Sequence, residues 1–323
     1  MIRIVFLAAV LGLGICVYFP YINFYDLGPI ERKVSAVAAA LPELTKLDSY
    51  LQEKERAFPN LRKGLEKSIT WNNESKKEQT EFSFVYLPGF TATRMEIAPV
   101  VEVLAKKFNA NSFFSRLPSH GEEADDYSNS RTEDFFETAM EAVLIGEKLG
   151  RKPVFIGLST GAALLQYTLE KRKLGHAFVA LSPAFYGRFH YMNIALNPWF
   201  GLGLVKLIIG QYYEWVPHFP TQELYWNTKY NTDVLPEMTR VFQLTSQQDY
   251  TQFNCPYFLI YNEHDSVIDY TVMLDKWRQA RNPLNKAKAI TSRDLHVVAG
   301  DITSPENTKI VIKDIFEWLT QIK

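Results

Sequence analysis

Short apolar runs alternate with amphipathic stretches from about residue 82 to the end of the chain. The runs are rich in valine, isoleucine, phenylalanine and tyrosine and are bounded by turn residues, which predicts β-strands. They lie at residues 82–87, 111–117, 153–158, 177–181 and 256–261. Apolar residues at helical spacing predict helices between and after them, at residues 96–108, 132–149, 160–174 and 307–322. Strands that alternate with helices indicate an α/β fold, with a mostly parallel sheet and helices on both of its faces.

Residues 186–252 interrupt this alternation, because they are too many for a simple connection between two elements. The segment is dense in aromatic and aliphatic residues, which fits either a pair of buried helices or a cap over a site whose substrate is itself apolar. Before the first strand, residues 34–63 have a helical pattern. We therefore expect a helical connector over residues 26–75 and a main domain over residues 76–323, with a cap insertion at about 186–252.

Residues 1–25 carry one charged side chain, Arg3, followed by an apolar run at residues 4–19. With Tyr21 and Ile22, the run reaches the length of a short membrane span. We therefore expect a transmembrane helix that holds the protein at a membrane by this single segment, on a side that the sequence does not determine. A cleaved secretory signal, which would leave the protein secreted or periplasmic, and a buried N-terminal helix are the alternatives.

The composition and charge of the 323-residue chain exclude several classes of protein. Hydrophobic residues make up 47% and charged residues 22%, as in ordinary globular proteins. The 35 basic and 36 acidic side chains nearly balance, which argues against a nucleic-acid partner. Cys16 and Cys255 are the only cysteines, so neither a disulfide framework nor a cysteine metal site is indicated. The acidic residues at 122–126 lack the spacing of a calcium loop, and no glycine-rich phosphate loop follows an early strand, so we expect no metal and no cofactor.

The stretch Gly157-Leu158-Ser159-Thr160-Gly161 lies between a predicted strand and a predicted helix. A Gly-x-Ser-x-Gly sequence in this setting is typical of a nucleophile elbow, a sharp turn that raises the serine oxygen above the edge of a sheet. Ser159 is therefore the candidate nucleophile, and a serine in an ordinary glycine-flanked turn is the alternative. A serine hydroxyl reacts only when a base takes its proton, so the chain must also supply a base and an acid that orients it.

The acid is expected between the serine and the base, because the chain order for this motif is serine, acid, histidine. The predicted strand at 256–261 ends directly before an Asn-Glu-His-Asp sequence, and sites in open parallel sheets form at the carboxyl ends of strands. Asp265 is the favoured acid, with Glu263 and Asp269 as alternatives.

The base is expected after the acid. His296, just before the last predicted helix, is the only histidine that follows Asp265. His120 precedes Ser159 and is set aside on chain order, whereas His264 is the direct neighbour of the favoured acid. The order therefore predicts a catalytic triad of Ser159, Asp265 and His296.

An oxyanion that forms during attack by the serine needs hydrogen-bond donors. The residue after the nucleophile ordinarily supplies one backbone N–H group, which here belongs to Thr160. The second is expected from Phe90, in the loop at residues 88–91, which we call the oxyanion loop. Gly89 lets this loop turn tightly with its amides toward the site.

From about residue 82 to the C-terminus, the chain resembles the α/β-hydrolase superfamily, in particular the branch of monoacylglycerol lipases, bacterial carboxylesterases and serine-aminopeptidase-like hydrolases. The matching segments are LPGFTATRMEIAPVVEVLA, SRLPSHGEEADDY, GLSTG, NEHDSVID and LHVVAGD. Two positions depart from this branch: Pro88 replaces the histidine of the usual His-Gly pair, and Ser119 replaces a glycine of the usual Pro-Gly-His-Gly. Because proline has no N–H group and a fixed φ, we expect the oxyanion loop to be tilted or stiffened.

The resemblance implies that residues 76–323 form an α/β-hydrolase fold that includes a helical cap. It also implies a serine hydrolase that cleaves carboxylic esters through an acyl-enzyme. The apolar cap favours acyl esters, such as monoacylglycerols or lysolipids, as substrates. A peptidase or thioesterase would use the same triad, and a membrane-tethered binding or scaffold protein that keeps the fold without catalysis is the alternative from another class.

Overall fold

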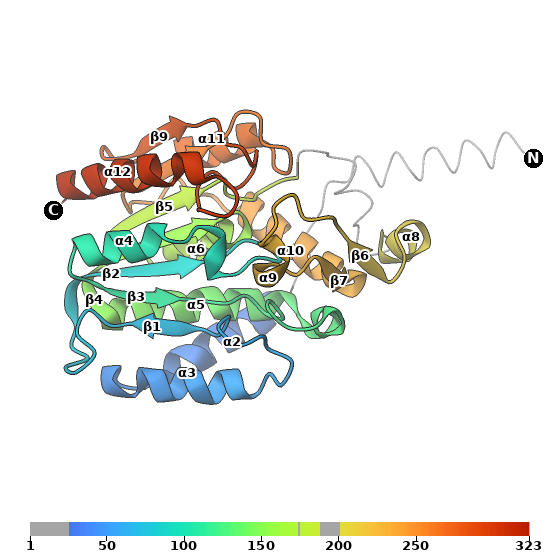
Figure 1. Ribbon diagram of the computed structural model, residues 1–323, viewed down its shortest axis with the longest axis horizontal. Helices are drawn as coiled ribbons and strands as arrows, with labels where there is room; N and C mark the ends of the chain where they lie inside the picture. The colour runs from blue at the N-terminus through green and yellow to red at the C-terminus, as the bar shows by residue number, and fades with distance from the viewer. Residues whose placement is uncertain (1–25, 174, 188–200, 323) are drawn as a thin grey trace, which may run out of the picture.

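Seven strands form the main sheet of the computed structural model, which describes residues 26–173, 175–187 and 201–322 (Figure 1). Their order across the sheet is β1-β3-β2-β4-β5-β8-β9. β1 is antiparallel to β3, and the other neighbours pair in parallel, which confirms the predicted α/β class. The strands are β1 (Ser68–Thr70), β2 (Thr80–Leu87), β3 (Asn111–Phe114), β4 (Gly150–Leu158), β5 (Ala177–Leu181), β8 (Tyr257–Tyr261) and β9 (Lys286–Ala289).

The two edge strands, β1 and β9, are not predicted by the sequence pattern. β1 has only three residues, and β9 consists of alternating lysine and alanine, partly exposed to solvent. Short strands with charged side chains are common at sheet edges, because they discourage pairing with another chain. Such strands carry little of the apolar signal by which the inner strands are predicted.

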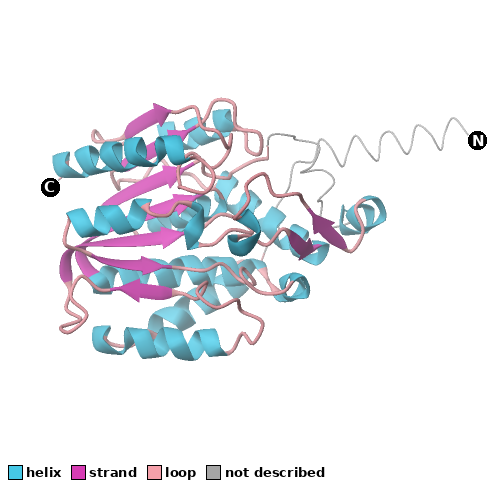
Figure 2. Ribbon diagram, in the orientation of Figure 1, coloured by secondary structure: helices cyan, strands magenta, loops and turns pink. Residues whose placement is uncertain are grey.

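Helices cover both faces of the sheet (Figure 2). Successive strand residues point to opposite faces, so that Val85 and Phe155 belong to one buried cluster and Phe84 and Ile156 to another. Residues of α5 and α6 complete the first cluster, and residues of α4 and α12 complete the second. The helices are α2 (Gly28–Ala40), α3 (Leu47–Arg56), α4 (Val100–Lys107), α5 (Thr132–Leu149), α6 (Thr160–Arg172), α8 (Gly201–Ile208), α9 (Gln222–Tyr225), α10 (Leu235–Gln247), α11 (Tyr270–Gln279) and α12 (Pro305–Gln321).

The connector attaches to the main domain through a buried carboxylate on α5. Glu141 accepts hydrogen bonds from Tyr50 at 2.8 Å and Lys54 at 2.9 Å, both on α3, and from Lys67 at 2.5 Å. Burial by itself raises the pKa of Glu141, but the charges of Lys67 and Lys54 outweigh it and lower that pKa to about 2. Glu141 is therefore ionised at neutral pH and pairs with cations from the connector.

The described part of the predicted cap insertion at residues 186–252 contains a small sheet as well as helices. Its strands, β6 (Tyr212–Glu214) and β7 (Lys229–Asn231), are antiparallel to each other. Together with α8 and α9, they lie beyond the carboxyl ends of the main parallel strands (Figure 1). This is the end of an open parallel sheet at which binding sites form.

Within the described ranges, no helix is long and apolar enough to cross a membrane. This finding corrects the prediction of a transmembrane helix. The longest described helix, α5, has 18 residues and carries charged side chains along its length, several of which pair with lysines of α2 and α3. The apolar run at residues 4–19, on which the prediction rested, lies outside the described residues.

Candidate active site

Ser159 lies on a sharp turn between β4 and α6. Its φ of 53° and ψ of −119° fall in a region that residues other than glycine rarely adopt, so the turn is strained. The flanking glycines are required for close packing. A Cβ on Gly157 would lie 2.6 Å from the backbone of Ala162, and one on Gly161 would lie 2.2 Å from the carbonyl oxygen of Leu87. The turn has the strand–turn–helix geometry of a nucleophile elbow.

The side chains of Ser159, His296 and Asp265 form a hydrogen-bonded chain. Ser159 Oγ is 2.9 Å from His296 Nε2, and His296 Nδ1 is 2.8 Å from Asp265 Oδ2. The N–H groups of Val267 and Ile268 both donate to Asp265 Oδ1 at 2.8 Å, which fixes the carboxylate. The Asp265 side chain is fully buried, whereas Ser159 is 8% exposed. The structure thus brings together three residues that are far apart in the chain.

The other residues considered for these positions lie elsewhere. Glu263 and His264 are exposed to solvent. Asp269 caps the start of α11, where its Oδ1 accepts a hydrogen bond from the N–H group of Thr271 at 2.9 Å. Of the candidate acids, Asp265 is the one that reaches His296.

Burial and charge act on His296 in opposite directions. Burial lowers the pKa of its imidazole, but the charge of Asp265 and the hydrogen bond with it raise the pKa, and Asp294 and Glu96 add to the increase. The net result is a pKa above the usual value for histidine. A raised pKa suits a base that becomes an imidazolium when it takes a proton from serine.

Two backbone N–H groups near Ser159 are available to an oxyanion. Within the part of the chain that the structure describes, neither Phe90 nor Thr160 donates its N–H group to a hydrogen-bond acceptor. The oxyanion loop also lies directly against the nucleophile turn, because a Cβ on Gly89 would be 3.2 Å from Ser159 Cβ. The two predicted donors therefore belong to backbone segments that meet at Ser159.

His120, which chain order sets aside as a base, holds the oxyanion loop. Its Nε2 accepts a hydrogen bond from the N–H group of Thr91 at 2.7 Å, and its Nδ1 donates to the carbonyl oxygen of Pro118 at 2.8 Å. This pattern requires a neutral imidazole, and burial lowers the pKa of His120 to about 3. Chain order says nothing about such a role, and the match of the segment RLPSHG to the hydrolase branch is the sequence signal for it.

Aromatic side chains surround the oxyanion loop. The ring of Phe90 lies edge-on to those of His120, Tyr127 and Tyr230, at centroid distances of 5.5, 5.9 and 5.2 Å. Tyr230 belongs to β7 of the cap insertion. The contact with Tyr230 therefore joins the cap to the loop beside Ser159 and gives this side of the site an apolar character.

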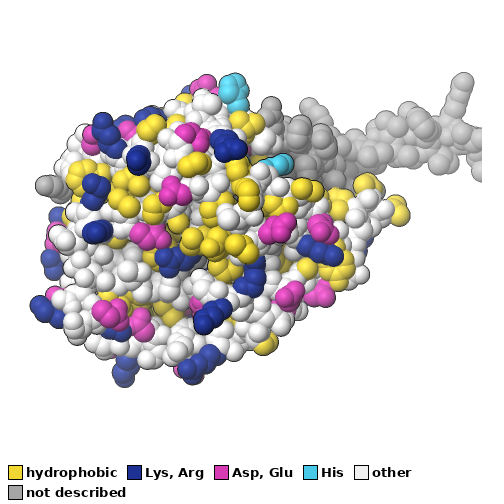
Figure 3. All heavy atoms as spheres, in the orientation of Figure 1, with side chains coloured by type: hydrophobic (Ala, Val, Ile, Leu, Met, Phe, Trp, Pro, Cys, Tyr) yellow, Lys and Arg dark blue, Asp and Glu magenta, His cyan; other side chains and the backbone are white. Residues whose placement is uncertain are grey.

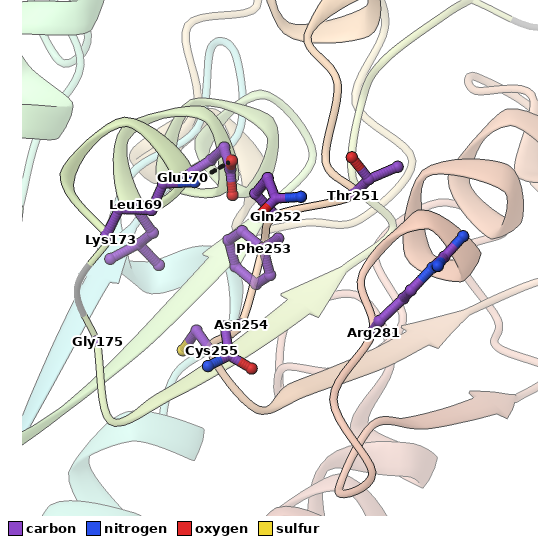
Figure 4. Close-up of a pocket in the computed structure, with 10 residues that line it drawn as sticks. All are labelled: Leu169, Glu170, Lys173, Gly175, Thr251, Gln252, Phe253, Asn254, Cys255 and Arg281. Atoms are coloured by element: carbon purple, nitrogen blue, oxygen red, sulfur yellow. Dashed lines mark hydrogen bonds and ion pairs between the residues drawn. The ribbon is translucent and has the colours of Figure 1, made fainter.

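A separate pocket of about 490 Å³ lies at the opposite end of α6 (Figure 4). Glu170 and Lys173, at the end of α6, line it together with Cys255, just before β8, and Arg281. Ser159 lies at the start of α6, beyond the carboxyl end of β4. This pocket is therefore not part of the site around Ser159.

The described residues supply neither a metal site nor a basic surface on the visible face. No group of three or more histidine, cysteine, aspartate or glutamate side chains among them could hold a metal ion. In Figure 3, basic and acidic side chains are interspersed over the face that is shown. That face therefore lacks the continuous positive band that binds nucleic-acid phosphates.

Several solved structures share this fold. A metagenome-derived lipolytic enzyme matches with a TM-score of 0.66 and 12% identity, over 81% of this chain and 99% of that one. A monoacylglycerol lipase from Paleococcus ferrophilus matches with a TM-score of 0.59 and 12% identity, over 80% of this chain and 98% of that one. A soluble variant of the monoglyceride lipase from Saccharomyces cerevisiae matches with a TM-score of 0.54 and 11% identity, over 80% of this chain and 92% of that one. At these identities the likeness concerns the fold alone.

Sequence comparison gives the family. Among curated proteins, none matches this sequence. The model of the alpha/beta hydrolase family matches residues 84–300, which include the end of β2, the nucleophile turn and the loop that carries His296. Because the match extends over more than half of the chain and agrees with the observed sheet, the protein belongs to the alpha/beta hydrolase family.

Proposed function

We propose that this protein is a serine hydrolase that cleaves carboxylic esters through an acyl-enzyme intermediate. The observation that carries the proposal is the hydrogen-bonded chain from Ser159 through His296 to Asp265, with its distances of 2.9 and 2.8 Å. Both distances lie within the hydrogen-bond reach that a base needs to take the proton of a nucleophile and that an acid needs to orient the base. The strained backbone of Ser159 supports the same function, because strain of this kind persists mainly at functional sites.

In the proposed reaction, Ser159 Oγ attacks the ester carbonyl while His296 Nε2 takes its proton. Asp265 accepts the Nδ1–H hydrogen bond, which holds the imidazole in the correct tautomer and stabilises the imidazolium. The N–H groups of Phe90 and Thr160 donate to the oxyanion of the tetrahedral intermediate. His296 then gives the proton to the leaving alcohol, and a water molecule activated by the same imidazole releases the acid.

Acyl esters such as monoacylglycerols or lysolipids are the proposed substrate class. Two features support this class. The aromatic cluster of Phe90, Tyr127 and Tyr230 lies beside the nucleophile turn. Two of the structures with the same fold are lipases for monoacylglycerols by name. An apolar wall favours an acyl chain over a charged peptide.

A fluorophosphonate label and a series of p-nitrophenyl esters, from acetyl to palmitoyl, test the proposal. We expect stoichiometric labelling of the wild-type protein and hydrolysis of the longer esters, and we expect both to be lost in Ser159→Ala. Ser182→Ala is the matched control, because Ser182 is a buried serine at the end of the neighbouring strand β5, and its hydroxyl has no hydrogen-bond partner within the described residues. The control should be labelled at the wild-type rate.

The outcomes separate the possible functions. A folded wild-type protein that takes up no label would refute the enzyme and favour a binding or scaffold protein. Labelling together with a preference for acetyl esters would retain the serine hydrolase and remove the lipid substrates. Labelling with hydrolysis of peptide or thioester substrates alone would replace the ester hydrolase by a peptidase or a thioesterase.

A further inference from the structure

Glu96 is a buried carboxyl group beside the oxyanion loop with no part in the reaction described above. It ends the short 3-10 helix η2 (Arg94–Glu96) and is 1% exposed. Its Oε1 accepts a hydrogen bond from the N–H group of Gly89 at 2.6 Å and another from the hydroxyl of Tyr86 at 2.5 Å. A Cβ on Gly89 would lie 3.2 Å from Glu96 Oε2 and 3.2 Å from Ser159 Cβ. Gly89 is therefore in close contact with Glu96 and with Ser159.

Titratable groups from two other parts of the chain face Glu96. Tyr86 belongs to β2, whereas Asp294 and His296 belong to the loop before α12. Burial raises the pKa of Glu96 to about 7, although the hydrogen bonds from Tyr86 and Gly89 and the charge of His296 lower it. In turn, the charge of Glu96 is one of the interactions that raise the pKa of His296. Each of the two groups therefore favours the charged form of the other.

We propose that Glu96 is a positioning residue for the ester hydrolysis proposed above. Its carboxylate fixes the Gly89 amide, and through it the N–H group of Phe90 that faces the oxyanion. The negative charge of the same carboxylate favours the imidazolium of His296. This inference rests on the proposed function and adds to it a residue that touches neither the substrate nor the reacting atoms.

The role follows from the start of the oxyanion loop. Pro88 has no N–H group, so Gly89 has the first backbone donor after β2. An unpaired N–H group in this buried position would be unfavourable, and the loop would turn to find another acceptor. Because the peptide planes of Gly89 and Phe90 are adjacent, a rotation of the Gly89 amide would also turn the Phe90 N–H group away from the oxyanion.

The charge of Glu96 has a separate effect on the reaction. His296 must be neutral to accept the proton of Ser159, and it becomes charged in the transition state. A nearby carboxylate stabilises that charge and at the same time raises the pH below which His296 is already protonated. A glutamine at position 96 retains an acceptor for the Gly89 N–H group but carries no charge. It therefore separates the two effects.

The variants Glu96→Gln and Glu96→Ala test the proposal, with Glu102→Gln as the matched control. Glu102 is a half-buried carboxylate on α4 that pairs with Arg94 at 3.0 Å and makes no hydrogen bond to the oxyanion loop within the described residues. For each protein, kcat and KM are measured from pH 5 to 9 with the best p-nitrophenyl ester. The rate constant of fluorophosphonate labelling is measured in parallel, and circular dichroism establishes folding.

We expect Glu96→Ala to lose roughly 100-fold in kcat and in labelling rate with little change in KM, as when an oxyanion donor is lost. Glu96→Gln should lose less than about tenfold in kcat, and the acid limb of its kcat/KM profile should move to lower pH, because His296 loses a neighbour that carries part of a negative charge near neutral pH. Glu102→Gln should match the wild type in both respects. A purely structural role would not move the acid limb.

Distinct results overturn the inference and the proposed function. If the wild type is active and labelled but folded Glu96→Ala keeps its kcat and labelling rate, Glu96 does not position the loop and the serine hydrolase stands. If the acid limb of Glu96→Gln coincides with that of the wild type, the charge has no part in the reaction. If Glu96→Ala does not fold, Glu96→Gln tests the inference in its place. A kcat and an acid limb that both match the wild type would then overturn it. A wild-type protein that is neither active nor labelled refutes both.

Discussion

Replacing Gly161 by alanine tests whether the nucleophile turn and the oxyanion loop must lie as close together as they do. A Cβ at this position would be 2.2 Å from the carbonyl oxygen of Leu87 and 2.4 Å from that of Pro88. Ordinary van der Waals contact begins at 3.4 Å, so the end of β2 or the start of α6 would have to move by the difference of about 1.2 Å. Both oxygens belong to the backbone, which cannot rotate away as a flexible side chain can.

This movement would separate Ser159 from the N–H group of Phe90 that the proposed reaction uses. A displacement of about 1 Å at a catalytic centre costs roughly 100-fold in rate, which corresponds to about 2.7 kcal/mol of activation free energy. The added methyl group also overpacks the turn, at a cost of about 1–3 kcal/mol in the free energy of unfolding. We therefore expect Gly161→Ala to fold with a lower melting temperature and to lose about 100-fold in kcat/KM.

The assay compares kcat/KM per folded molecule for the wild type, Gly161→Ala and a control that is equally crowded. Gly146→Ala serves as the control, because its Cβ would lie 2.5 Å from Val85 Cγ2 and 3.0 Å from the ring of Phe155, within the core. The control should lose stability and keep its kcat/KM. A folded Gly161→Ala protein with the kcat/KM of the wild type would refute the reasoning, and so would equal losses of kcat/KM in the two variants.

Further variants test the acid and a buried ion pair. Asp265→Asn should lose about 10²–10⁴-fold in kcat, because an amide does not hold the required imidazole tautomer; a kcat near that of the wild type would exclude Asp265 as the acid. In the wild type, kcat/KM should fall as the pH drops through the pKa of His296, which is raised above the ordinary histidine value of about 6.5. In Asp265→Asn this acid limb should move to lower pH, because the carboxylate that raises the pKa of His296 is gone. Arg116→Met should lower the free energy of unfolding in urea by about 3–5 kcal/mol, because it leaves the buried carboxylates of Glu55 and Glu122 without their cation. A urea midpoint equal to that of the wild type would contradict this prediction.

The inner sheet can be predicted from the sequence because its strands are buried on both faces. Residues 153–158 contain a continuous apolar run, and the same side chains fill both hydrophobic clusters of the structure. β9 cannot be predicted in the same way, because its lysines leave no apolar pattern. Its place is determined by pairing with β8, along which Phe258 aligns with Lys286. Such pairing depends on the rest of the fold.

Chain order and strand ends are sufficient to propose the residues around Ser159, but they cannot distinguish side chains within one loop. Glu263, Asp265 and Asp269 follow the same strand, and the direction of each side chain depends on the backbone of the turn. The structure turns Asp265 toward His296 because two backbone N–H groups hold its other oxygen. A residue such as Glu96 has no sequence signal of its own, because its role depends on a contact with the loop that the fold creates.

The proline at the start of the oxyanion loop does not by itself indicate a protein without catalysis. The N–H groups of Gly89 and Thr91 are held by the side chains of Glu96 and His120, and the amide between them, that of Phe90, has no acceptor within the described residues. The loop is thus fixed on both sides of the donor that it would offer to an oxyanion. Burying a carboxyl group and a neutral imidazole for this purpose opposes folding, as does the strained turn at the serine. A scaffold that only kept the fold would gain nothing from these arrangements, whereas a hydrolase would use each of them to stabilise its transition state.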